Sequence, residues 1–244
     1  MPQTQEHIVK AFDESLEKLR QTLLRMGGMA EAQLSRAIQA LARRDAALAA
    51  EVVRDDLEID RLEQQVSNDA VKMLALRQPM ANDLREIVSA LKISADIERI
   101  GDYAANVAKR SIALSQLPAV KPAYAVPRLA RLVQENIKET LDAYVNRDIV
   151  KAVEVWQRDE EIDEIYTGLF RELLTYMMED PRNISPCTHL MFIAKNVERI
   201  GDHATNIAET VYFEETGRRL EGNRPKGDNS SFAVVKPEEL SEES

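Results

Sequence analysis

The sequence contains a single cysteine, Cys187, among 244 residues. One cysteine excludes an internal disulfide and suits a reducing cytoplasm. Glycine (8 residues) and aromatic residues (5%) are also scarce, which leaves little of the material from which strands and tight turns are built. Alanine, leucine, glutamate and arginine dominate instead, and this composition favours helices over strands.

A positive net charge and long apolar runs are absent as well. The 32 Lys and Arg residues against 42 Asp and Glu residues give a net charge of −10, which repels phosphodiester backbones and argues against a nucleic-acid partner. No apolar run approaches the roughly 20 residues that cross a bilayer. The first residues lack the basic start and apolar stretch of a signal peptide. We therefore expect a cytoplasmic protein without a transmembrane segment.

Residues 5–215 carry the pattern of amphipathic helices. Apolar residues recur at spacings of three and four, as at Leu84, Ile87, Val88 and Leu91, which is the helical period. Stretches rich in Pro, Asn and Asp interrupt the pattern. They divide the chain into six predicted helices, at residues 5–43, 46–77, 82–114, 127–146, 149–178 and 187–215.

The chain contains an internal repeat. The segment "ERIGDYAANVA" from Glu98 and the segment "ERIGDHATNIA" from Glu198 agree at eight of eleven positions. Each half also has an "RD…EID" segment upstream of this copy. A repeat of this length predicts an all-α fold of two tandem, pseudo-symmetric three-helix bundles. The predicted organisation is a first repeat at 1–115, a Pro-containing linker at 116–126, a second repeat at 127–219, and a disordered polar tail at 220–244.

Carboxylates recur in pairs with a spacing of four residues. Such a pair stands on one face of a helix, and like charges there destabilise the helix by roughly 0.2–0.5 kcal/mol. Four pairs therefore need an explanation. They are Asp56 with Asp60 and Glu98 with Asp102 in the first half, and Asp159 with Asp163 and Glu198 with Asp202 in the second.

A helical hairpin would bring these pairs together. Facing residues of an antiparallel hairpin have numbers with a constant sum, because both helices rise equally per residue. Asp56 opposes Asp102 and Asp60 opposes Glu98 in a hairpin centred on Pro79. The pairs of the second half have the same relation around their own predicted turn. Each hairpin thus predicts four carboxylates at one level, on the stripe that faces a neighbouring helix.

Four carboxylates at a partly buried level must protonate, meet basic groups, or hold a cation. Oxygen ligands of this kind suit Mg²⁺, Mn²⁺, Fe, Zn²⁺ or Ca²⁺. Arg99 and Arg199 each lie three residues before an aspartate, so ordinary ion pairs on the helix surface are the alternative. Gly101 and Gly201 stand beside the pairs and indicate close helix approach, room for a ligand, or simple packing.

The doubled "ERIGD" motif, the paired acidic motifs and the two three-helix halves resemble the PhoU family of bacterial phosphate-uptake accessory and regulatory proteins, over about residues 5–215. The resemblance implies metal sites on the eight carboxylates, with iron or zinc clusters in some members and Mg²⁺ or Mn²⁺ in others. It also implies a homodimer that represses the phosphate-starvation response and phosphate uptake. Such a protein links a phosphate ABC transporter to a sensor histidine kinase at the inner membrane.

Two other functions remain open at this stage. A di-metal enzyme in a helical bundle would use Glu together with an ExxH motif, and His7, His189 and His203 form no such motif, so we expect a protein that is not an enzyme. A metal-free helical scaffold is the other alternative. The two repeats also differ, since Asn196 takes the place of Asp96, and the second site is expected to bind less strongly or to hold another ion.

Overall fold

The computed structural model describes residues 2–77, 79, 81–222, 224, 227, 228 and 230. These residues form helices and loops and contain no β-strand, which confirms the all-α prediction. The elements are α1 (Pro2–Arg43), α2 (Ala46–Arg77), α3 (Asn82–Ser115), the 3₁₀ turn η1 (Lys121–Tyr124), α4 (Val126–Asn146), α5 (Ile149–Gln157), α6 (Asp159–Glu179), the 3₁₀ turn η2 (Pro181–Asn183) and α7 (Ile184–Thr216).

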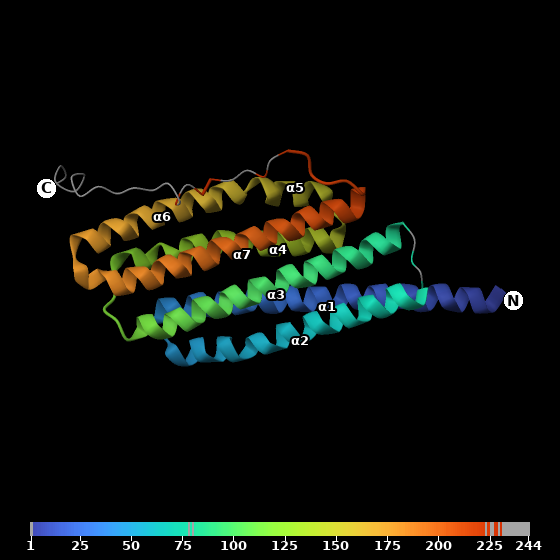
Figure 1. The fold of residues 1–244 in the computed structure, drawn as a ribbon, viewed down its shortest axis with the longest axis horizontal. Helices are drawn as coiled ribbons and strands as arrows, with labels where there is room; N and C mark the ends of the chain where they lie inside the picture. The colour runs from blue at the N-terminus through green and yellow to red at the C-terminus, as the bar shows by residue number, and fades with distance from the viewer. Residues whose placement is uncertain are drawn as a thin grey trace.

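Two bundles lie side by side in an elongated molecule (Figure 1). Helices α1 to α3 form the first bundle and α4 to α7 the second, and the two bundles meet mainly where α3 packs against α7. Both predicted hairpins are present, since Pro79 lies between α2 and α3, and η2 lies between α6 and α7. None of the described helices has an apolar stretch long enough to cross a lipid bilayer.

One predicted helix is divided in the structure. The segment expected to be continuous over 149–178 consists of α5 and α6, with a break at Arg158. The backbone N–H of Arg158 bonds to the carbonyls of both Glu154 and Val155, so the last turn of α5 tightens and a new helix begins at Asp159. The Arg158 side chain pairs with Glu139 of α4, which ties the break to the neighbouring helix.

One large apolar core runs through both bundles, and a second, small cluster consists of Ala70, Met73 and Ile87. Fully buried residues from the two halves belong to one contiguous cluster, among them Leu23, Leu34, Ile97, Leu129 and Leu190. These residues are the apolar stripes that the helical period predicts. Because the stripes of α3 and α7 contribute to the same cluster, the bundles are joined by packing rather than by the linker alone.

Gly101 and Gly201 mark close contacts between helices. A Cβ atom at Gly101 would lie 3.0 Å from Ile59 Cδ1 and 3.1 Å from Asp56 Oδ1, both on α2. A Cβ atom at Gly201 would lie 3.1 Å from Ile162 Cδ1 on α6. Among the explanations left open by the sequence, the structure supports close approach of the two helices in each hairpin.

Candidate functional site

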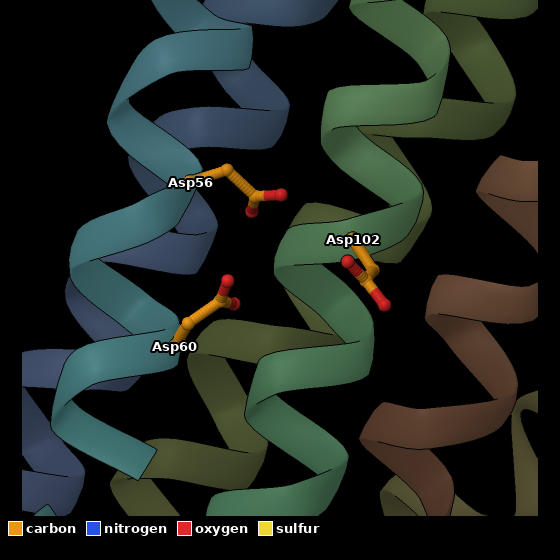
Figure 2. Close-up of side chains that lie close together, drawn as sticks. All are labelled: Asp56, Asp60 and Asp102. Carbon is orange, nitrogen blue, oxygen red and sulfur yellow. The ribbon is translucent and has the colours of Figure 1, made fainter. Parts of the chain in front are cut away.

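Three carboxylates converge between α2 and α3, as Figure 2 shows. Asp56 and Asp60 project from α2 toward Asp102 of α3, and one oxygen of each lies within 4.8 Å of the others. All three side chains are partly buried. The hairpin geometry that the sequence predicted thus brings these residues together. We call Asp56, Asp60, Glu98 and Asp102 the first acidic cluster.

Glu98 belongs to the same face but stands apart from this group of three. Its carboxylate lies 3.5 Å from Arg99 Nε, and Arg99 Nη1 also donates to Asp102 Oδ2 at 3.2 Å. Burial raises the pKa of Glu98, and the negative charges of Asp102 and Asp60 raise it further against the opposing charge of Arg99. Glu98 therefore borders the group of three, and the ion pairs considered for Arg99 do form.

Gln33 of α1 forms hydrogen bonds with the first acidic cluster and its surroundings. Its side-chain amide donates to Asp56 Oδ1 at 2.9 Å and to the Gly101 carbonyl at 3.3 Å. Burial raises the pKa of Asp56, which the hydrogen bond from Gln33 opposes and the charges of Asp102 and Asp60 reinforce. Gln33 was not predicted as a site residue. Its role could have been inferred from its position, because it is a polar residue on the buried stripe of α1 that also contains Ala30 and Ala37.

The group of three has the donor set of a site for a hard cation. Carboxylate oxygens that ligate Mg²⁺ or Ca²⁺ stand about 2.0–2.6 Å from the ion, so two ligands on one ion are at most about 4–5 Å apart. One carboxylate oxygen each of Asp56, Asp60 and Asp102 lie within 4.8 Å of one another, which fits this requirement. Arg99, which pairs with Asp102, has a side chain that is 57% exposed and can turn toward solvent.

The matching carboxylates of the second half, Asp159, Asp163, Glu198 and Asp202, form the second acidic cluster. In this cluster the guanidinium of Arg224, which follows α7 in the chain, lies between the carboxylates of Asp159 and Asp202. Arg224 Nε donates to Asp159 Oδ2 at 2.7 Å, and Arg224 Nη2 donates to Asp159 Oδ1 at 2.6 Å and to Asp202 Oδ1 at 2.7 Å. The negative charges of this cluster therefore meet a basic group, one of the three outcomes that the sequence left open.

The remaining two carboxylates of the second acidic cluster also have partners. Asp163 Oδ2 accepts from the backbone N–H groups of Gly227 at 2.9 Å and Asp228 at 3.2 Å. Lys195 Nζ donates to Glu198 Oε1 at 2.8 Å and to Asp228 Oδ2 at 2.9 Å. Burial raises the pKa of Glu198 to about 7, although the hydrogen bond from Lys195 opposes the shift.

The two clusters therefore differ more than their sequences indicated. Asp159, Asp163 and Glu198 are only 2–4% exposed, whereas the carboxylates of the first acidic cluster are partly exposed. Arg199, which lies three residues before Asp202 in the sequence, donates instead to the Tyr103 hydroxyl at 3.4 Å. The partners supplied by Arg224, Gly227 and Asp228 were not predicted from the sequence. Residues 223, 225, 226, 229 and 231–244 of the predicted disordered tail lie outside the described residues.

A line of polar side chains joins the second acidic cluster to the first bundle. Asp96 Oδ1 of α3 lies 2.7 Å from His203 Nδ1 and accepts from Asn206 Nδ2 at 3.4 Å. Asn206 Oδ1 in turn accepts from Arg224 Nη1 at 3.1 Å. Asp96, which has Asn196 as its counterpart in the second repeat, thus serves the contact between α3 and α7.

Two helical bundles in tandem, each with an acidic cluster between its last two long helices, define a repeat protein of the helical-bundle class. The sequence model of the PhoU domain matches residues 23–111 and 126–211, one copy in each bundle. The chain therefore belongs to the PhoU family, as the "ERIGD" motifs indicated.

Relatives match nearly the whole chain. The phosphate-specific transport system accessory protein PhoU homolog of Rhizobium meliloti is 53% identical over 227 residues, which cover 92% of this chain and 95% of that protein. The homolog of the same name in Caulobacter vibrioides is 52% identical and covers 91% and 97%. The crystal structure of PhoU from Pseudomonas aeruginosa is 41% identical, with a TM-score of 0.83, over 85% of this chain and 100% of that chain.

Proposed function

We propose that this protein is an accessory regulator of a phosphate-specific transport system, which represses phosphate uptake and the phosphate-starvation response when phosphate is plentiful. The relatives' names and their similarity over more than nine-tenths of the chain support this role. In the proposed role the protein acts from the cytoplasm at the inner membrane face. There it links a phosphate ABC transporter to a sensor histidine kinase as an adaptor and not as an enzyme.

Cation binding at the first acidic cluster is part of this proposal. The observation that carries it is the convergence of Asp56, Asp60 and Asp102 from two helices. Oxygen-only ligation favours Mg²⁺ or Mn²⁺, and Fe or Zn²⁺ also accept carboxylates. A bound cation would neutralise the repulsion between carboxylates and hold α2 at a fixed distance from α3.

Metal binding is tested with the double variant D56N/D60N. Calorimetric titration of the purified protein with Mn²⁺, together with elemental analysis after gel filtration, should show one binding event fewer than in the parent. Asp55→Asn is the matched control, since Asp55 neighbours the site on α2 but pairs with Arg36. A parent protein without bound metal, with full stability in chelator, would favour the metal-free scaffold instead.

The regulatory role is tested in the cell. Deletion of the gene should raise alkaline phosphatase activity at high phosphate, and the wild-type gene should restore repression. The D56N/D60N gene should restore less repression than the D55N gene at equal protein levels. Full repression in the deletion strain would contradict the proposed role.

We also propose a homodimer, as the resemblance implies. Exposed apolar residues on α2 support it, since Leu57, Val71 and Leu76 are 72%, 59% and 77% exposed. Light scattering coupled to size-exclusion chromatography should give twice the mass of 27.6 kDa. A mass of one chain at micromolar concentration would rule the dimer out.

A further inference from the structure

The chain turns back over the second bundle after α7. Gly217 ends the helix in a left-handed conformation (φ 70°), and its N–H bonds to the Phe213 carbonyl, as in common helix C-caps. Beyond it, the described residues lie over α5 and the start of α6 (Figure 1). We call the described residues of this stretch, 218–222, 224, 227, 228 and 230, the tail segment.

Arg224 is the anchor of the tail segment. Its guanidinium spans Asp159 with two parallel hydrogen bonds and reaches Asp202 and Asn206 with the remaining N–H groups. This planar fork matches a carboxylate in a way that a lysine ammonium does not. The Arg224 side chain is only 15% exposed, and hydrogen bonds to Asp159 raise its pKa although burial opposes the shift.

The backbone of the tail segment also fits the surface of α6 closely. The N–H groups of Gly227 and Asp228 point at one oxygen of Asp163. A Cβ atom at Gly227 would lie 3.1 Å from the Glu160 carbonyl and 3.3 Å from Asp163 Cβ, so a larger residue would have to move away from the helix. The contact between residue 227 and α6 therefore requires a glycine, and it includes backbone packing in addition to the ion pairs of Arg224.

A polar atom next to this contact points to a ligand as well. Glu198 is 4% exposed, and its Oε2 atom has no hydrogen-bond partner among the described residues. Its other oxygen bonds to Lys195, which also reaches Asp228 of the tail segment. Two cationic side chains, Arg224 and Lys195, therefore bond to carboxylates of the second acidic cluster, whereas the ion pairs of the first acidic cluster come from the exposed Arg99.

We propose that the second acidic cluster is a binding site for an arginine-bearing peptide, which this chain fills with its own tail segment. Arg224 stands where a metal ion would stand between Asp159 and Asp202, so the bound tail segment excludes a cation from this cluster. The two repeats then have different ligands: a cation for the first cluster and a guanidinium for the second. A divalent cation or an arginine-bearing segment of another chain would compete with the tail segment for the same carboxylates.

Hydrogen exchange measured by mass spectrometry on the full chain tests the contact. The amides of residues 227 and 228 should exchange slowly in the parent and about tenfold or more faster in R224A. G227A should have the same effect without loss of charge. Arg219→Ala is the control, because Arg219 is an exposed arginine of the same segment. Rapid exchange in the parent, or equal exchange in R224A and R219A, would overturn the proposal.

Competition with metal is tested where the first acidic cluster cannot contribute. In a D56N/D60N background, Mn²⁺ should bind weakly, and the further change R224A should raise its affinity at least several-fold. R219A in the same background should not. Equal Mn²⁺ affinity with and without Arg224 would overturn the exclusion of metal by the tail segment. This outcome is separate from the metal test of the first cluster, which uses the chain with Arg224 present.

Discussion

At the scale of single residues, Glu214 on α7 is a buried carboxylate outside the two clusters. It is 9% exposed, and its Oε2 atom has no partner among the described residues. Burial raises its pKa to about 7, and the negative charges of Glu86 and Glu215 add to the shift against Arg20 and Arg147. An unfolded chain has a glutamate pKa near 4.3. The native state therefore binds more protons between these pH values, and stability falls as the pH rises toward 7.

Glu214→Gln should remove this loss of stability. We expect the variant to match the parent near pH 5 and to exceed it at pH 8 by about 1–3 kcal/mol in the free energy of unfolding. Urea denaturation at both pH values measures the difference. The exposed Glu172 of α6 supplies the control variant E172Q, which should change stability little at either pH. A variant that is less stable than the parent at pH 8 would contradict the expectation.

The candidate ligands could be predicted residue by residue because their spacing and the hairpin register are local patterns. Asp56 and Asp60 are one helical turn apart, and the position of Pro79 decides which residues of α3 they face. Arg224 could not be predicted, because it lies 65 residues from Asp159 in a segment without helical period. No rule based on spacing connects two such segments.

At the scale of elements, the close contact of α2 and α3 depends on Gly101. Gly28 of α1 is a useful comparison, because a Cβ atom there would meet nothing within 4 Å. Alanine stabilises a helix interior by up to about 1 kcal/mol relative to glycine, and G28A should show this gain. G101A should instead destabilise the protein by about 1–2 kcal/mol, since its Cβ would press on Ile59 and Asp56.

The same substitution should also displace Asp56, because the new Cβ would lie 3.1 Å from its Oδ1 atom. G101A should also weaken Mn²⁺ binding at the first acidic cluster, whereas G28A should not. Thermal unfolding and calorimetric titration of both variants measure the two effects. Equal behaviour of G101A and G28A would show that α2 can move aside without cost.

Most element boundaries follow from turn residues and helical period, and the exception is the break between α5 and α6 at Arg158. The apolar stripe continues across Arg158, so nothing in the pattern of α5 and α6 predicts two helices. The break is accompanied by contacts with other parts of the fold, such as the pairing of Arg158 with Glu139. Tertiary contacts of this kind do not appear in the local sequence.

At the scale of the whole molecule, the shared core predicts that the two bundles unfold together. Leu34 is fully buried in the first bundle, and L34A should cost about 2–5 kcal/mol. Trp156, the only tryptophan of the chain, lies in α5 of the second bundle and donates to Glu209. Its fluorescence and the far-UV circular dichroism should therefore shift to the same lower urea midpoint. An unchanged fluorescence midpoint would mean that the bundles unfold independently.

The contact between α3 and α7 places residues of α3 beside both acidic clusters. Asp96 and Glu98 are two residues apart on α3 and so point about 200° apart around the helix axis. Glu98 borders the first acidic cluster, while Asp96 reaches Asn206, which bonds to Arg224. A rotation of α3 that pulls Glu98 inward would carry Asp96 against its partners on α7. Any such coupling is reciprocal. If a ligand of the first repeat changes the affinity of the second repeat for its ligand by some factor, the ligand of the second repeat changes the affinity of the first by the same factor.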